Sequence, residues 1–445
     1  MNTAKNTILN NKMIESGDII GVGVSGGSDS MSLLHFLVAL QEELDFEVVA
    51  IHVDHSIREN SSSDAFFVQD YCKEHKIRFY KFRIDVPKYA KEKNESIETA
   101  ARECRYNVFN SLIEKGVISK IALAHHMSDQ AETILLHIFR GSGVTGAKGM
   151  SLVKNEYTIR PLLETSKQEI MEYIANNDIP FVTDETNKDS TYARNFIRNE
   201  ILPLIKTKWP NIENSIVSFG KTCAEDSDYI KKQTNTDAFI VNEKSVKIPL
   251  NCFLMHPSIV SKTIFTAFEI LGIEKDIERR HIDLIKDLYE NGENGKRISL
   301  PFSIQAYKEY DYITIANNQK PASINKWEFK VGTFEAENFG NVTVKKTKDF
   351  SPKEDSLILD YRKIPSDALW RIRQNGDIFN RFGGGTKKLK EYFIDQKIPQ
   401  RIRSYIPVLA SGNKILVVAG KEISEDVKIT SETTQAIRIS VKIQD

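Results

Sequence analysis

Apolar runs and amphipathic stretches alternate along the first 125 residues. Short runs rich in Val and Ile predict four strands, at residues 18–25, 46–54, 77–86 and 117–126. Between them, apolar residues recur at spacings of three and four, which predicts helices at residues 29–40, 62–75 and 96–116. This alternation is typical of parallel strands joined by right-handed crossovers, and it predicts a doubly wound α/β sheet.

The remaining pattern predicts further domains. Helical spacing continues at 128–141, 166–180 and 193–205, and it stays mainly helical from about residue 216 to about 320. Many short β-branched runs follow and predict a small α+β region. We therefore expect a first domain at 1–215, a mainly helical middle domain at 216–325 and a small α+β C-terminal domain at 326–445.

Two glycine patterns overlap in residues 19–30, which read IIGVGVSGGSDS. Gly21, Gly23 and Gly26 match G-x-G-x-x-G, in which the first glycine ends the strand of a dinucleotide-binding fold. Such a strand would be very short here, and Asp54 lies beyond the position, about 20 residues on, where that fold places an acidic residue. We therefore favour a strand that continues through Val24 and a phosphate-binding loop after it.

In this interpretation the loop is S-G-G-S-D-S, Ser25 to Ser30. Its glycines let backbone N–H groups face a ligand, and the start of the following helix favours phosphate. We expect Ser28 or Asp29 to cap that helix. A glycine turn that only starts a helix is the alternative for such a short motif.

Polar residues also follow other predicted strands. Asp54 and His55 follow the second strand, and His125 and His126 follow the fourth. Because open parallel sheets bind ligands at the carboxyl ends of their strands, these positions together predict a nucleotide site.

The loop after a buried strand resembles the PP-loop ATP pyrophosphatase superfamily, whose members cleave ATP to AMP and pyrophosphate and adenylate a carbonyl oxygen. Six further blocks resemble the tRNA(Ile)-lysidine synthetase family, at residues 53–72, 95–109, 123–150, 160–174, 179–205 and 375–424. The resemblance is weak in the middle of the chain. It implies an ATP-dependent ligase that joins free L-lysine to C2 of the wobble cytidine in isoleucine tRNA with a CAU anticodon. That change would convert codon reading from AUG to AUA and charging from methionine to isoleucine.

The resemblance also implies roles for individual residues. ATP would be bound by the loop together with Asp54 and Arg105, the loop residues being Ser25, Gly26, Gly27, Ser28, Asp29 and Ser30. Asp29 would lie beside Mg²⁺, although an acid in a first helical turn is also favoured by the helix dipole alone.

Asp129 and Glu132 lie three residues apart, on one face of a predicted helix. They would hold the lysine ammonium and help it lose a proton, although an acidic helix start is the alternative. His125 would bind phosphate or cytidine, or be structural. Where the family often has a further aspartate, this chain has Ser128.

Basic residues predict contacts with the tRNA backbone. Arg194 and Arg198 share a helix face, and residues 371–403 hold nine Lys and Arg against three acids. Ile378 stands where the family has an arginine, for which Arg381 could substitute. The C-terminal candidates are Arg381, Lys387, Lys388, Arg401 and Arg403, although a solvated charged face is the alternative for any single lysine.

The composition of the chain excludes several other classes of protein. Lys and Arg together number 61, as do Asp and Glu, so nucleic-acid binding must come from local patches. The four cysteines form no C-x-x-C pair, which speaks against zinc ribbons, disulfide frameworks and the related tRNA thiolases. No signal peptide or membrane-spanning run is visible, so we expect a cytoplasmic protein that does not bind membranes. A homodimer is left open, and a non-catalytic tRNA-binding module remains the competing hypothesis.

Overall fold

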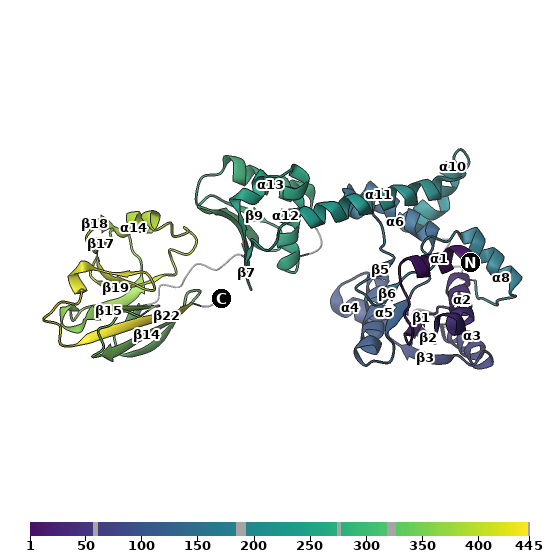
Figure 1. Ribbon diagram of the computed structural model, residues 1–445, viewed down its shortest axis with the longest axis horizontal. Coiled ribbons are helices and arrows are strands. Elements are labelled where there is room, and N and C mark those ends of the chain that lie inside the picture. Colours follow the sequence, from purple (N-terminus) through teal and green to yellow (C-terminus); the bar gives the residue numbers. More distant parts are fainter. Residues whose placement is uncertain (57–60, 184–192, 274–276, 318–325, 354, 444–445) are drawn as a thin grey trace. The chain divides into compact units, whose positions relative to one another are not determined.

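The computed structural model describes residues 1–445 except 57–60, 184–192, 274–276, 318–325, 354 and 444–445. The chain divides into two compact units, Met1–Tyr229 and Ile230–Asp445. Figure 1 shows their elements. The three-domain division expected from the sequence stays a prediction, and its boundary at residue 325 lies outside the described residues.

The first unit is built on a six-stranded sheet with the order β3-β2-β1-β4-β6-β5. All neighbouring pairs are parallel except β5 and β6. The strands are β1 (Ile19–Gly23), β2 (Glu47–Asp54), β3 (Arg78–Arg83), β4 (Lys120–Ala122), β5 (Val153–Lys154) and β6 (Thr158–Ile159). The doubly wound α/β prediction is confirmed.

Helices cover both faces of this sheet (Figure 1). On one face, Ile20 and Val22 of β1 join a core shared with α1, α2, α3 and α8, whereas Phe109 of α5 packs with residues of the opposite face. The helices of the unit are α1 (Asn2–Asn10), α2 (Ser28–Leu44), α3 (Ser61–Glu74), α4 (Val86–Lys93), α5 (Ile97–Glu114), α6 (Met127–Phe139), α7 (Val144–Ala147), α8 (Lys167–Asn176), α9 (Ala193–Phe196), the π-helical η2 (Ile197–Ile201), α10 (Leu202–Lys206) and α11 (Ile212–Gln233), which ends in the second unit.

The two glycines of the competing dinucleotide pattern lie inside β1, as the strand interpretation requires. A Cβ on Gly21 would stand 2.7 Å from Cδ1 of Ile51 and 2.8 Å from Cδ1 of Ile118. A Cβ on Gly23 would lie 3.2 Å from the ring of Phe109. These glycines therefore permit close packing beneath the sheet, where larger side chains would not fit.

The second unit begins with an α+β region. Besides the expected helices it contains a five-stranded antiparallel sheet with the order β7-β8-β11-β10-β9. Strands this short are hard to distinguish from fragments of buried helix by periodicity. The elements are β7 (Ile240–Asn242), β8 (Ser245–Pro249), the 3₁₀ turn η3 (Leu250–Leu254), α12 (Pro257–Ile270), α13 (Arg279–Asn291), β9 (Arg297–Leu300), β10 (Ile304–Lys308) and β11 (Tyr312–Asn317).

The C-terminal part is α+β, as predicted. It holds a seven-stranded sheet and a four-stranded sheet, ordered β13-β14-β22-β15, with α14 beside the larger one. The elements are β12 (Lys326–Glu328), β13 (Gly332–Ala336), β14 (Gly340–Thr347), β15 (Ser356–Asp360), η4 (Tyr361–Lys363), β16 (Leu369–Ile372), β17 (Ile378–Arg381), β18 (Gly385–Lys388), α14 (Leu389–Asp395), β19 (Pro407–Ser411), β20 (Lys414–Val418), β21 (Glu422–Ile423), η5 (Glu425–Val427) and β22 (Ala436–Ile443).

Candidate active site

The strand order places a candidate site in the first unit. From β1 the chain crosses to β2 and then to β3 on one side, and from β3 it returns to β4 on the other side of β1. The strand order therefore reverses between β1 and β4, and ligands bind at such a switch point in open α/β folds. A cavity of about 880 Å³ adjoins the loop after β1 and the start of α6. Its lining includes Ser25, Gly27, Ser28, Asp29, Ser30, His126, Ser128, Asp129, Glu132, Lys167, Arg198 and Lys206.

The loop after β1 is short and leads directly into α2. Gly26 adopts a φ of +92°, a conformation that side chains disfavour, so glycine is required there. The Ser25 N–H donates to Oγ of Ser30 at 3.2 Å, and this hydroxyl donates to the carbonyl of Gly27 at 3.0 Å. α2 then begins at Ser28 with Gly27 as its N-cap, so the expectation that Ser28 or Asp29 caps the helix is wrong.

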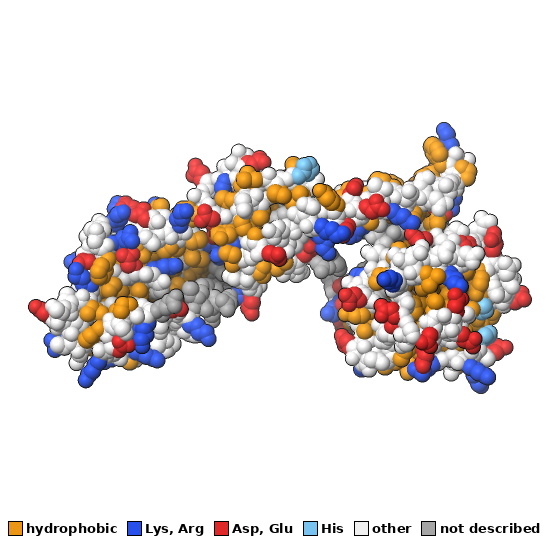
Figure 2. All heavy atoms as spheres, in the orientation of Figure 1, with side chains coloured by type: hydrophobic (Ala, Val, Ile, Leu, Met, Phe, Trp, Pro, Cys, Tyr) orange, Lys and Arg blue, Asp and Glu red, His pale blue; other side chains and the backbone are white. Residues whose placement is uncertain are grey.

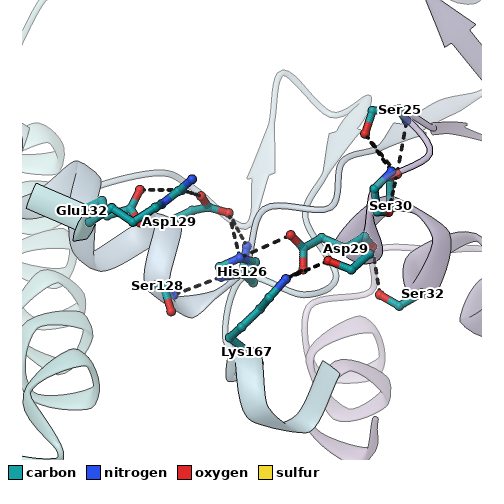
Figure 3. Close-up of polar contacts among 12 residues, drawn as sticks. Ser25, Asp29, Ser30, Ser32, His126, Ser128, Asp129, Glu132 and Lys167 are labelled. Atoms are coloured by element: carbon teal, nitrogen blue, oxygen red, sulfur yellow. Dashed lines mark hydrogen bonds and ion pairs between the residues drawn. The ribbon is translucent and has the colours of Figure 1, made fainter. Parts of the chain in front are cut away.

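The Asp29 side chain does not cap α2 but forms two ion pairs. Its Oδ1 accepts from Nζ of Lys167 at 2.5 Å, and its Oδ2 lies 3.6 Å from Nε2 of His126 (Figure 3). Burial works against the charged carboxylate, but the His126 and Lys167 interactions outweigh it and lower the pKa of Asp29 to about 2. Asp29 is thus an anion at any pH near neutrality.

Of the two adjacent histidines, His126 lies in the cavity. It is the N-cap of α6, and its Nδ1 accepts from the Ser128 N–H at 3.2 Å, so Nε2 faces the carboxylates of Asp29 and Asp129. Burial disfavours the charged ring, yet the two carboxylates raise the pKa of His126. His125 is not among the lining residues, and burial lowers its pKa to about 4.

Asp129 and Glu132 point to the same place from α6, as their spacing predicts, and both line the cavity. Each accepts hydrogen bonds from both Arg194 and Arg198. Nε of Arg198 lies 2.6 Å from Oε1 of Glu132, and Nε of Arg194 lies 2.9 Å from Oε2. The Nη2 groups reach Oδ1 of Asp129 at 2.9 and 3.1 Å. Glu132 is almost fully buried, and the two arginines compensate the charge of its carboxylate.

Asp54 and Arg105, predicted to bind ATP, are not among the residues that line this cavity. They gather at the end of β2, where the buried Asp54 accepts from the Ser56 N–H at 2.9 Å. Nη2 of Arg105 lies 3.3 Å from Nε2 of His55, and burial together with the arginine charge lowers the pKa of His55 to about 4. Their part in ATP binding stays a prediction.

Two of the predicted tRNA-binding arginines hold the second unit together. Nε of Arg401 lies 2.6 Å from Oε1 of Glu309, with both side chains largely buried. Arg403 donates to the carbonyl of Ile398 at 2.8 Å and to Oη of Tyr310 at 3.1 Å. Both arginines therefore link the C-terminal part of the chain to the loop between β10 and β11.

The other C-terminal candidates are more exposed. Arg381 pairs with Glu422 at 3.2 Å, Lys387 pairs with Asp395 at 2.8 Å, and Lys388 is exposed at the start of α14. On the face shown in Figure 2, basic and acidic side chains are interspersed over the second unit. The tRNA contacts predicted for these residues stay predictions.

The sequence placed His126 at the nucleotide site without giving it a role of its own, and it missed Lys167. The segment T-S-K-Q-E held a usable signal for this lysine, because a serine followed three residues later by glutamate marks a helix start. Ser166 indeed caps α8 by accepting from the Glu169 N–H at 3.1 Å. This fixes Lys167 at the helix start, but its contact with Asp29, 138 residues away, could not be predicted.

Comparisons with known proteins agree with this architecture. Residues 2–205 match a PP-loop domain and residues 369–441 match the TilS substrate C-terminal domain. The tRNA(Ile)-lysidine synthase of Clostridium tetani is 35% identical to the chain, over 98% of this chain and 97% of that protein. The chain belongs to the tRNA(Ile)-lysidine synthase family. The family enzyme of Clostridium acetobutylicum is 34% identical over the whole of both chains, which confirms the resemblance found in the sequence blocks.

The cysteines of this family member fit no thiol chemistry. Cys72, Cys104 and Cys223 are buried and Cys252 is partly buried. Burial raises the pKa of all four thiols, that of Cys72 to about 12. A thiol nucleophile needs a lowered pKa and access to its substrate, so a persulfide mechanism is not supported.

No helix in the described part of the chain combines the length and hydrophobicity needed to cross a lipid bilayer.

Proposed function

We propose that this chain ligates free L-lysine to C2 of the wobble cytidine in isoleucine tRNA with a CAU anticodon, converting ATP to AMP and pyrophosphate. The observation that carries this proposal is that the phosphate loop and the Asp129–Glu132 pair line one cavity, in a chain of this family. A cavity of about 880 Å³ can take a nucleotide and a reacting group together. We expect the reaction to take place in the cytoplasm.

The reaction needs two displacements. The cytidine O2 attacks the α-phosphorus of ATP, and the bond to pyrophosphate breaks. The ε-amine of lysine then attacks C2, and the C2–O bond breaks to release AMP. Adenylation is required because the bare oxygen is a poor leaving group.

On the ATP side, the amides of the Ser25–Ser30 loop would accept the phosphates at the start of α2. The ionised Asp29 fits a Mg²⁺ ion of the kind that proteins bind through one or two carboxylates and substrate phosphates. Within the described residues no three His, Cys, Asp or Glu side chains form a group that could hold a metal ion on its own. Asp29 would hold the ion together with the phosphates of the nucleotide. When bound, Mg²⁺ offsets the negative charge of the departing pyrophosphate.

On the lysine side, Asp129 and Glu132 would hold the substrate ammonium. Burial opposes ionisation of Asp129, but His126 and Arg194 outweigh it and lower its pKa. A carboxylate of low pKa is a weak base, so orienting the amine is its larger contribution, and loss of the ammonium proton precedes attack. His125 is not among the residues that line the cavity, and its contact with cytidine or phosphate stays a prediction.

On the tRNA side, Arg194 and Arg198 would contact phosphates next to the reacting base. Arg198 makes three hydrogen bonds to Asp129 and Glu132, fewer than the five N–H donors of a guanidinium. About a third of each arginine side chain remains exposed. The exposed Lys387 and Lys388 would add further contacts to the tRNA backbone.

The decisive experiment supplies ATP, Mg²⁺, labelled lysine and unmodified isoleucine tRNA, and scores label in tRNA together with pyrophosphate. Equal amounts of both are expected, and Asp29→Ala should abolish them. Release of orthophosphate, or tRNA without label, would contradict the proposed reaction. Methionine tRNA is the matched control, because it shares the CAU anticodon and should remain unlabelled.

A further inference from the structure

Lys167 lies directly above the phosphate loop. It is the first residue of α8, and its Nζ contacts Oγ of Ser28 at 2.9 Å and Oδ1 of Asp29 at 2.5 Å (Figure 3). The ammonium thus bridges two elements that are far apart in the sequence. Its side chain is 40% exposed and lines the cavity, so a ligand in the cavity can reach it.

Lys167 differs from the other lysine and arginine side chains that line the cavity. Arg198 is held by Asp129 and Glu132, and Lys206 lies 2.9 Å from Glu213, so both face carboxylates outside the phosphate loop. Lys167 contacts the side chains of the loop itself. Of these three cations, it is the one placed where phosphate oxygens of a nucleotide on the loop would lie.

The Lys167–Asp29 ion pair is suited to exchange. A lysine ammonium is a compact charge on a flexible stem, so it can move to a new anion without movement of the backbone. A polyphosphate carries more negative charge than one carboxylate and competes well for it. The ionisation of Asp29 does not depend on Lys167 alone, because His126 also lowers the pKa of Asp29. The carboxylate would therefore stay charged when Lys167 leaves.

We propose, resting on the ligase function proposed above, that Lys167 is a catalytic residue whose ammonium transfers from Asp29 to the β- and γ-phosphates of ATP and remains on the pyrophosphate as it leaves. Negative charge accumulates on pyrophosphate while the bond to the α-phosphorus breaks, so a cation there stabilises the transition state. The same movement releases Asp29 toward Mg²⁺. Lys167 makes no contact with the adenosine or with AMP in this scheme.

The test measures binding of magnesium pyrophosphate and of AMP to the full chain by calorimetry, with and without Lys167→Ala. Loss of one charge-assisted contact should weaken pyrophosphate binding about tenfold or more and leave AMP binding unchanged. Lys167→Arg, which keeps the charge, should recover most of the affinity. Unchanged pyrophosphate binding, or equal weakening of both ligands, would overturn the assignment.

Two controls make the outcome specific. Lys221→Ala removes a lysine of the same unit that pairs with Glu164 at 2.5 Å and does not line the cavity, so neither affinity should change. Lys167→Gln keeps the first part of the stem and a polar end while it removes the charge, and it serves if the alanine variant fails to fold. These affinities are measured without tRNA or lysine. A wild-type chain that forms no lysidine would therefore refute the proposed function, while the binding data for Lys167 could still be interpreted.

Discussion

The carboxylates of Asp29 and Asp129 are both 3.6 Å from one atom, Nε2 of His126. Asp29 belongs to the half of the cavity proposed for ATP, and Asp129 to the half proposed for lysine. A single imidazole therefore connects the two halves, and it is fixed there because its other nitrogen caps α6.

Substitution of His126 should separate its structural role from its role in the site. His126→Ala loses the N-cap of α6 and should cost about 1 kcal/mol in the free energy of unfolding. His126→Asn restores a good capping side chain, so its stability should be close to wild type. Both variants should lose lysidine formation, measured as labelled tRNA. A His126→Asn variant with full activity would show that the imidazole does no more than cap the helix.

Glu132 should govern the Michaelis constant for lysine. Glu132→Gln removes the buried carboxylate that pairs with the two guanidinium groups. The free energy of unfolding, measured with urea, should therefore fall by several kcal/mol. In the folded fraction the KM for lysine should rise about tenfold or more, since one ammonium contact is lost, while the KM for ATP stays unchanged. Glu164→Gln, which removes an equal charge from the Lys221 pair, should alter neither constant.

The dependence of stability on pH should report on Asp29. Its pKa falls from 3.8 to about 2 on folding, so its contribution is complete above pH 3.8 and is lost as the pH falls through about 2. The full shift corresponds to about 2 kcal/mol, and solvent screening at this one-third exposed side chain reduces it. Urea unfolding of the wild type and of Asp29→Asn should differ at pH 6 and converge toward pH 2. A difference in unfolding free energy between the two proteins that stays constant from pH 6 to pH 2 would refute this contribution.

Basic residues of the second unit should divide into two classes. Lys388→Ala removes an exposed charge, so tRNA affinity should fall modestly and the slope of log affinity against log salt should decrease by about one. Arg401→Ala instead leaves Glu309 buried without its partner, so the main loss should be in stability. Filter binding over a salt series, with urea unfolding in parallel, distinguishes the two. A reduced salt slope for Arg401→Ala without a loss of stability would contradict the division.

Local patterns were sufficient for the parts of the fold in which neighbours along the chain decide the conformation. The strand through Gly21 and Gly23 followed from its apolar pattern and the position of the turn, and the shared orientation of Asp129 and Glu132 followed from helical spacing. Which of two adjacent histidines faces the cavity could not be predicted, because this depends on which side chain caps α6.

Contacts between distant segments had no signal in the sequence. The Arg401–Glu309 pair joins residues that are 92 positions apart in the sequence. A basic stretch that predicts tRNA contact can therefore supply ion pairs within the protein instead. The middle sheet was missed for a related reason. Its strands have only three to six residues, which is too short for a clear alternating pattern. Pairing with antiparallel neighbours, which the sequence does not show, stabilises them.

The start of α2 has a further consequence. Gly27 occupies the N-cap and has no side chain with which to satisfy the first amides of the helix. A serine or aspartate at this position could have accepted a hydrogen bond from one of those amides, which glycine cannot do. In the proposed function the phosphates of ATP accept from them instead, so the amide protons in the first turn of α2 should exchange with solvent more slowly when ATP is present.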